Sequence, residues 1–367
     1  MPCDVSRAVY PTRVVRVTAS SSARLRVSRQ LAWQAEQCRD LGSPLYARLL
    51  SRAAADAEAG GIVWQVLRRR QRDPFSSALG LRFMGAVHRI VLDGRGDRLA
   101  VHYPSVGGDP RTKRLWTDFS ATLAEHEGEL RDAIGDPVQT NEVARAAALV
   151  GGFLRIAQQR KHPLRLLELG ASAGLNLRWD HFRYVAGRRR AWGPPRSPVR
   201  LEAAFRGEVP LRGVCEITER GGCDTTPIDP ATREGELRLK SFVWADQVER
   251  SERLAAAIAI ARRVPVTVDL ADAADWLEAQ LDRLRRDVTT VVFHTIVWQY
   301  LGRRSQERVT TAIEAAGRRA RSDRPLAWLR LEPGGDMAKL TLTMWPGGDE
   351  CLLARSGYHG DPVIWLA

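Results

Sequence analysis

The chain has 367 residues, of which 44% are hydrophobic and 27% are charged. This composition excludes a chain that is disordered throughout, and the length suggests two domains or one domain with a large appendage. The formal net charge of +13 would suit a nucleic-acid-binding protein. However, only four of the 56 basic residues are lysines, and the arginines are scattered along the chain. We therefore favour a general arginine bias, typical of a GC-rich genome, over a nucleic-acid-binding surface.

The sequence contains no feature of a membrane protein or of a zinc protein. The most apolar helical stretch, residues 143–157, contains two arginines and is too short to cross a bilayer. The five cysteines include no Cys-x-x-Cys pair, and there is no His-Glu-x-x-His motif. No metal site is predicted on this basis. Unpatterned cysteines are typical of reduced thiols, so we expect a cytoplasmic protein without a membrane partner.

The first 27 residues differ in composition from the remainder of the chain. They are rich in arginine and serine, and Asp4 is their only acidic residue. Such a segment is typical of a transit peptide, of a disordered tail, or of a start codon placed too far upstream. We expect a disordered tail.

Residues 28–160 contain the capping and terminating residues that are typical of a helical region. Ser28 is a suitable N-cap for a helix over 29–41, and Ser43-Pro44 opens a second helix that ends at Gly60. Apolar spacing predicts three further helices, over 79–91, 113–134 and 140–159.

From residue 161 to the end, strands alternate with helices. Four short apolar segments have the composition of buried strands: 164–169, 265–268, 288–293 and 325–331. Helical segments lie between or before them, at 245–263, 271–286 and 305–320. This alternation predicts an α/β domain whose parallel sheet is covered on both faces. Segments 338–345 and 351–366 predict an antiparallel hairpin at the edge of that sheet.

A glycine-containing loop, residues 168–176, follows the first strand and precedes a helical segment. Glycine permits a sharp turn and close approach to a ligand, and the start of a helix offers free N–H donors. A dinucleotide-binding fingerprint would require glycine at two positions that are occupied here by Ser172 and Leu175, so the loop matches that motif poorly.

The loop instead resembles the first motif of class I methyltransferases, with the pattern Glu-x-Gly-x-Ser-x-Gly. A serine at the middle position is a mild departure from the usual glycine. The resemblance implies that the loop contacts S-adenosylmethionine through Glu168, Gly170, Ala171, Ser172, Gly174 and Asn176.

The same resemblance extends to later segments of the chain. It implies that Asp224, at the end of a second strand over 214–224, holds the ribose hydroxyls, and that Asp272 and Ala273 contact adenine. Asp224 is also a suitable turn residue, and Asp272 a suitable helix N-cap. Asp224 lies far from the loop, so residues 182–210 have to form an insertion, and Glu216 or Glu219 is the alternative ribose acid.

His294 follows the fourth strand and is the candidate catalytic residue. An imidazole titrates near neutral pH, so it suits a general base, and a buried structural histidine is the alternative. Residues 298–300 line either the acceptor pocket or the core. No Asn-Pro-Pro-Tyr motif follows this strand, which argues against methylation of an exocyclic base nitrogen.

The chain from about residue 29 onward also resembles a bacterial family known as domain of unknown function 2332. The sequence segments that match are 102–105, 138–143, 168–176, 222–224 and 297–301. Membership implies a Rossmann-like core of methyltransferase type.

Together these features predict a Rossmann-like sheet of seven mostly parallel strands behind a helical N-terminal region that covers the cofactor site. We expect an S-adenosylmethionine-dependent methyltransferase that acts on a small molecule, since such catalysis is chiefly positioning. The alternatives are a nucleotide-binding scaffold without turnover and an RNA-binding methyltransferase.

Overall fold

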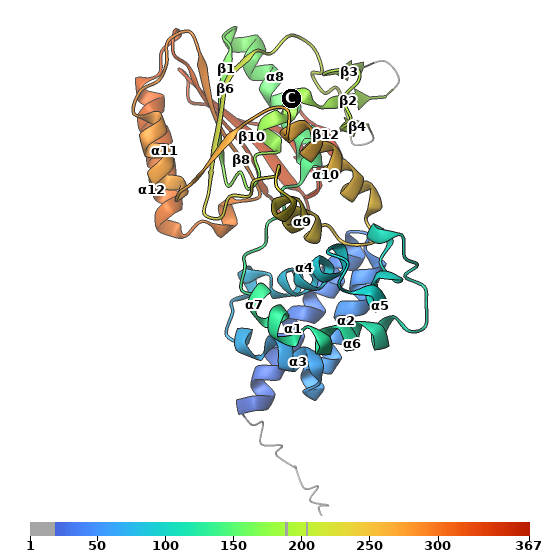
Figure 1. Cartoon of the computed structure of the whole chain (residues 1–367). Coiled ribbons are helices and arrows are strands. Elements are labelled where there is room, and N and C mark those ends of the chain that lie inside the picture. The colour runs from blue at the N-terminus through green and yellow to red at the C-terminus, as the bar shows by residue number, and fades with distance from the viewer. Residues whose placement is uncertain (1–18, 188–189, 203–204) are drawn as a thin grey trace, which may run out of the picture.

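The structure is a computed structural model in which residues 19–187, 190–202 and 205–367 are described. The chain forms two bodies that meet along one side (Figure 1). A helical body contains the N-terminal part of the described chain, and an α/β body contains a large sheet with helices on both faces. The expected tail falls largely on residues 1–18, which lie outside the described residues.

In the part of the chain that the structure describes, seven α-helices build the helical body. They are α1 (Ala19–Asp40), α2 (Pro44–Ala59), α3 (Ile62–Leu67), α4 (Leu79–Leu92), α5 (Asp97–Ala100), α6 (Leu115–Glu125) and α7 (Glu127–Ala133). The predicted ends of α2 are confirmed: the Ser43 side chain accepts the Tyr46 N–H, and Gly60 ends the helix with a φ of 83°.

Two helices of this body differ from their predicted extents. α1 begins at Ala19, before the cap expected at Ser28, because Val27 and Leu31 belong to one buried face that continues back to Ala23. The helix expected over 113–134 is divided in two, since the backbone leaves the helical region at His126 (φ −114°, ψ 22°).

Within the described residues the main sheet has nine strands, so the expected number of seven is wrong. Its order is β5-β12-β11-β10-β9-β8-β1-β6-β7. The parallel part consists of β1 (Leu164–Leu169), β6 (Ile217–Asp224), β7 (Thr267–Leu270), β8 (Thr289–Thr295) and β9 (Leu326–Pro333). The antiparallel part consists of β10 (Ala338–Trp345), β11 (Glu350–Ser356) and β12 (Val363–Trp365).

The additional strands come from two sources. The segment expected to form one arm of the terminal hairpin folds as two strands, β11 and β12. The insertion contributes β5 (Phe205–Arg206), which pairs with β12 at the edge of the main sheet. The remainder of the insertion forms a small sheet from β2 (Arg183–Ala186), β3 (Arg190–Trp192) and β4 (Arg200–Leu201).

Helices cover both faces of the main sheet, as predicted (Figure 1). α8 (Ala146–Arg160) and α10 (Val248–Ala261) pack on one face, and α11 (Ala273–Leu281) and α12 (Arg303–Arg319) pack on the other. Successive side chains of β1 point to opposite faces of the sheet, so this strand contributes to the hydrophobic core on each face. Leu166 packs on the first face and Leu167 on the second. α8 was predicted as part of the helical region, but it packs on the sheet because its buried residues join that core.

The helix predicted directly after the glycine loop is a short 3-10 helix, η5 (Asn176–His181). Trp179 in this segment is fully buried and stacks between Phe153 and Trp192, at ring-centroid distances of 4.5 and 5.1 Å. The aromatic stack holds the chain against α8 and turns it into the small sheet, so the crossover from β1 to β6 contains no α-helix among its described residues.

The two bodies share a packed junction. The Asp246 carboxylate accepts hydrogen bonds from the Ser43 hydroxyl at 2.5 Å and from the Leu45 N–H at 2.9 Å. Trp244, from the segment between α9 (Arg233–Ser241) and α10, is buried in the core of the helical body.

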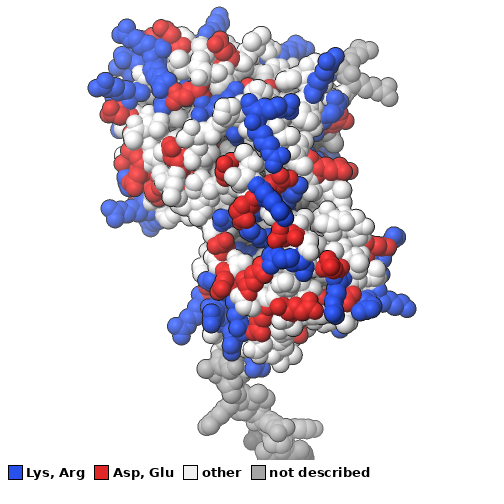
Figure 2. Space-filling view, viewed as in Figure 1, with Lys and Arg blue, Asp and Glu red and all other residues white. Residues whose placement is uncertain are grey.

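Lysine and arginine side chains alternate with acidic side chains over the face seen in Figure 2. Among the described residues, no helix combines the length and the apolar character that spanning a membrane requires. The four described cysteines, Cys38, Cys215, Cys223 and Cys351, are free thiols. Cys3 lies outside the described residues.

Candidate functional site

The candidate site lies where the chain reverses its direction across the parallel strands. β6 and β7 extend the sheet on one side of β1, and β8 and β9 extend it on the other. In open α/β sheets, ligands bind at such a switch point, beyond the carboxyl ends of the strands. The loops that leave β1 and β8 touch there, since a Cβ atom added to Gly170 would lie 2.3 Å from Val297 Cγ2.

The glycine loop has a left-handed backbone at three alternate positions. The φ angles are 65° at Gly170, 53° at Ser172 and 63° at Gly174. Ser172 therefore occupies a conformation that glycine adopts more readily. Its hydroxyl donates to Gln139 Oε1 at 2.6 Å, and its N–H is also bonded, so local contacts compensate for the backbone conformation.

Asp224 ends β6 directly beside this loop. Its Oδ2 atom accepts the Ser172 N–H at 2.9 Å, and its Oδ1 atom accepts the Thr226 N–H at 2.9 Å. The residue thus has both the position expected for the ribose acid and the contacts of a turn residue. The alternative acids lie nearer the amino ends of the same strands: the Glu216 carbonyl accepts the N–H of Leu164, the first residue of β1, and Glu219 forms an ion pair with Arg165.

A segment from the end of the helical body crosses the glycine loop. We call residues 139–142 the strap. Asn141 Oδ1 accepts the Leu175 N–H at 2.9 Å, and the Glu142 carbonyl accepts from the Asn176 side chain at 3.3 Å. The strap therefore bonds to the loop that sequence reasoning assigned to the cofactor. Sequence reasoning treated this segment as the start of a helix and missed these contacts.

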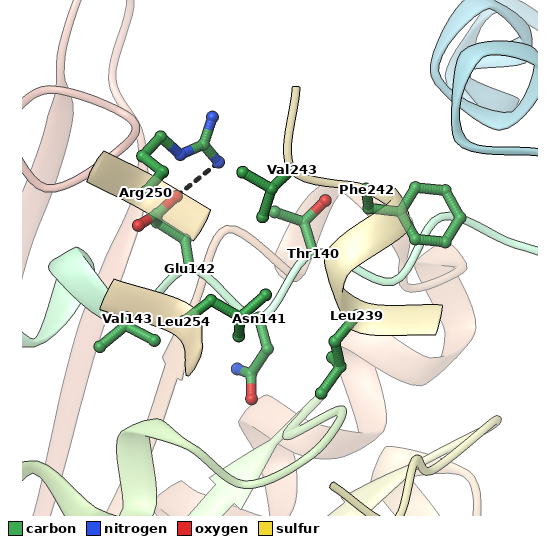
Figure 3. A pocket seen from close by; sticks show the side chains of 9 residues that line it. All are labelled: Thr140, Asn141, Glu142, Val143, Leu239, Phe242, Val243, Arg250 and Leu254. Carbon is green, nitrogen blue, oxygen red and sulfur yellow. Dashed lines mark ion pairs between the residues drawn. The ribbon is translucent and has the colours of Figure 1, made fainter. Parts of the chain in front are cut away.

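A buried ion pair fixes the strap to the α/β body (Figure 3). Glu142 Oε2 lies 2.5 Å from a guanidinium nitrogen of Arg250 on α10. Burial alone would raise the pKa of Glu142, but the basic groups of Arg250, His359 and Arg145 outweigh it and lower the pKa to about 2. Between the strap, α9 and α10 remains a hollow of about 10 Å³, which is the space of one water molecule.

Two acceptor oxygens at the ends of the glycine loop lack a donor among the described residues. They are Oε2 of Glu168 and Oδ1 of Asn176, and both side chains are buried. Burial raises the pKa of the Glu168 carboxyl well above its ordinary value, and the charge of nearby Asp224 adds to the increase. Buried acceptors without partners are rare in folded proteins, so these two oxygens are candidate acceptors for the donor groups of a ligand.

Replacing Glu168 by glutamine should raise the free energy of unfolding of the ligand-free protein at neutral pH. The folded chain keeps the proton of this carboxyl at pH values where the unfolded chain releases it, because only the folded pKa is raised. Its contribution to stability is therefore full below the ordinary glutamate pKa of 4.5 and is lost as the pH rises through the folded pKa.

Glutamine does not titrate, so the increase in the free energy of unfolding caused by Glu168→Gln should be larger at about pH 8 than at about pH 5. Urea unfolding of both proteins at the two pH values measures the difference. A gain that is equal at both pH values would attribute the effect to packing instead of ionisation.

The residues expected at adenine lie at the end of β7. Asp272 is the N-cap of α11 and accepts the N–H groups of Ala274 and Asp275, while Ala273 is buried. Leu270 pairs with Asp224 in the register of the two strands and therefore shares its face. Leu270 is 74% exposed, which gives this corner of the site an uncovered apolar side chain.

His294 is fully buried, and both ring nitrogens are hydrogen-bonded. Nδ1 lies 2.6 Å from Glu332 Oε1, and Nε2 accepts from the indole nitrogen of Trp328 at 3.1 Å. This is the arrangement of a structural histidine, and a role as a general base stays a prediction.

Glu332, at the end of β9, was not identified from the sequence. Its carboxylate also accepts the N–H groups of Val297 and Trp298, at 3.1 and 3.2 Å. It therefore holds the turn after β8, where Ile296 has a φ of 52°. An acidic residue at the carboxyl end of a predicted strand was the available signal.

The comparisons with known proteins identify one family. A family model described as "Uncharacterized protein conserved in bacteria (DUF2332)" matches residues 28–365. The match covers both bodies of the described chain, and the resemblance noted from the sequence phrases is confirmed. Neither the curated proteins nor the solved structures gave a match.

Proposed function

The chain belongs to the bacterial family DUF2332, and we propose that it binds S-adenosylmethionine at the switch point and transfers the methyl group to a small acceptor. The observation that carries the proposal is the pair of buried acceptors without donors among the described residues, Glu168 Oε2 and Asn176 Oδ1. The methionine part of S-adenosylmethionine carries an ammonium group with three N–H donors, and a carboxylate is its strongest partner.

The neighbouring residues suit the other parts of the cofactor. Asp224 Oδ2 accepts only the Ser172 N–H among the described residues and has a further lone pair, so the carboxylate can also accept a ribose hydroxyl. Oδ1 accepts the Thr226 N–H and is also approached at 3.5 Å by the Gln139 amide and the Thr226 hydroxyl. The exposed side chain of Leu270 would be covered by an adenine ring, with Asp272 and Ala273 beside it. The strand order β7-β6-β1-β8-β9 is consistent with a Rossmann-like core.

Two features depart from the methyltransferase pattern. The loop is followed by η5 instead of an α-helix, and Asn141 already occupies the Leu175 N–H. Both reduce the number of free donors at the loop, so the proposed site relies on acceptors for the ammonium and hydroxyl groups of its ligand.

The cofactor would supply a methyl group that its sulfonium already activates. The residues of the chain would bind and orient the reactants and exclude water, which accounts for much of the rate in such transfers. In this proposal Glu168 and Asp224 are binding residues. The acceptor has to approach from the side of β8, because β6 and β7 carry the proposed nucleoside contacts.

Thermal unfolding with added ligands tests the proposal. S-adenosylmethionine or S-adenosylhomocysteine at ~100 times Kd should stabilise the protein by about 2.7 kcal/mol, and NAD or ATP should stabilise it less. Glu168→Gln should lose this ligand-dependent shift although the unliganded variant stays folded. An equal or larger shift with NAD would contradict the proposal.

The strap favours a second function, a nucleotide-binding protein without turnover. Because the strap joins the helical body to the glycine loop, a ligand at the loop can change how the two bodies pack. Mass spectrometry of reaction mixtures with candidate acceptors separates the two functions. A protein that binds S-adenosylmethionine and never consumes it would support the second.

A further inference from the structure

A groove in the helical body lies apart from the candidate site. It has a volume of about 1070 Å³ and runs along α2, with the first residues of α6 and the segment before it on its other side. The lining part of α2 extends from Pro44 to Asp56, which corresponds to about 18 Å of helix. Its length is that of a three-turn helical segment.

Positive charge surrounds the groove. Arg39, Arg48, Arg52 and Lys113 line it, and none of them forms an ion pair with a carboxylate among the described residues. Among the described residues that line the groove, Asp56 alone is acidic, and it accepts the Val63 N–H. The groove therefore has an excess of positive charge that is complementary to an anionic partner.

The floor of the groove is apolar. Ala47, Leu49 and Leu115 are buried there, and the exposed small side chains of Ser51 and Ala55 allow a partner to approach α2 closely. An apolar floor between cationic rims is the pattern that accepts an amphipathic helix. A nucleic acid would gain little from such a floor.

The aromatic ring of the groove is not available for stacking with a base. Trp116 stacks on Phe119 with a centroid distance of 5.6 Å, and the guanidinium of Arg52 lies 5.3 Å from the Trp116 centroid. Single-stranded nucleic acids bind chiefly by stacking on exposed rings. The N-terminal segment of this chain is also unsuited, because residues 1–18 contain three arginines and one acidic residue.

We propose that this groove binds an acidic amphipathic helix of a partner protein. Apolar side chains of the partner would pack against Ala55 and the accessible part of Trp116, and its carboxylates would pair with Arg48, Arg52 and Lys113. The proposal does not depend on the cofactor, because no residue of the groove belongs to the candidate site.

Fluorescence anisotropy with a synthetic peptide tests the proposal. The probe is a labelled helix of about four turns with leucines along one face and glutamates on both sides of it. The full-length protein should bind it, and Arg48→Glu combined with Arg52→Glu should weaken binding by at least about tenfold. Arg303→Glu with Arg304→Glu, on the exposed side of α12, makes the same change of net charge and should leave affinity unchanged.

Three results would overturn the proposal. Equal loss of affinity in both double variants would mean that peptide binding depends only on the net charge of the protein. Tighter binding of oligouridine RNA than of the peptide, lost in Arg48→Glu with Arg52→Glu, would assign the groove to nucleic acid. A dimer in light scattering that the same variant dissociates would assign it to a second copy of the chain.

Discussion

Gly170→Ala is expected to lower the free energy of unfolding by about 2–5 kcal/mol. Two causes contribute. The φ of 65° is unfavourable for any residue with a Cβ atom, and that atom would lie 2.3 Å from Val297 Cγ2. Because Val297 belongs to the turn after β8, the variant also tests whether the two loops of the switch point are in contact. Urea unfolding followed by tryptophan fluorescence measures the change.

Gly107→Ala is the matched control. Its φ of 88° is equally left-handed, but nothing lies within 4 Å of the added Cβ atom, so only the backbone cost of about 1–2 kcal/mol is expected. Val297→Ala removes the Cγ2 atom at 2.3 Å and leaves the Cβ atom at 3.0 Å, so it should relieve most of the clash in Gly170→Ala and give a favourable coupling energy of about 1–3 kcal/mol. Additive effects of the two substitutions would show that the loops are apart.

Elements with strong local signals were predicted well. The strand 164–169 was predicted to the residue because an apolar run lies between a proline and a glycine, and α2 because Ser43 and Gly60 mark its ends. η5 was not predicted, because the stacking of Trp179 between Phe153 and Trp192 depends on residues distant in the sequence. Local patterns contain no information on such packing.

The residues of the candidate site were likewise predicted only in part. The resemblance to the methyltransferase motifs placed Asp224 beside the glycine loop, and the Ser172 N–H does bond to its carboxylate, although an insertion separates the two in the sequence. The strap was missed because Gln139 and Asn141 reach the loop across more than 30 residues, and side-chain amides have no periodic pattern. Glu332 was missed for the same reason: its partners Val297 and Trp298 precede it by a whole helix.

Asp224→Ala should reduce stability, because the carboxylate accepts two backbone N–H groups, and it should also reduce cofactor affinity if the proposed contact with ribose exists. Without it, the N–H groups of Ser172 and Thr226 lose their acceptor. Hydrogen bonds to a charged group contribute about 1.5–3 kcal/mol each, and partial solvation of the freed N–H groups limits the expected loss to about 2–4 kcal/mol. The left-handed Ser172 would also lose a contact that holds its backbone.

The loss of affinity follows from the proposed contact with ribose. Removing one hydrogen bond to the Asp224 carboxylate should weaken S-adenosylmethionine binding by at least about tenfold, measured by titration calorimetry at a temperature where the variant is folded. Asp229→Ala is the matched control, since this residue accepts the Ala231 N–H at 2.9 Å in the same loop and is not assigned to the cofactor. It should lower stability by about 1 kcal/mol and leave affinity unchanged.

The two measurements separate the two roles of Asp224. A loss of stability with unchanged affinity would identify the residue as a turn cap alone, and Glu219 could not replace it, because Glu219 pairs with Arg165 and Arg285 nearer the other end of β6. Asp224→Asn refines the result. Its single side-chain oxygen can accept only one of the two N–H groups, and its NH₂ group faces the other donor. If ribose binding requires the charge, this variant should lose affinity to the same extent as Asp224→Ala while it keeps part of the stability.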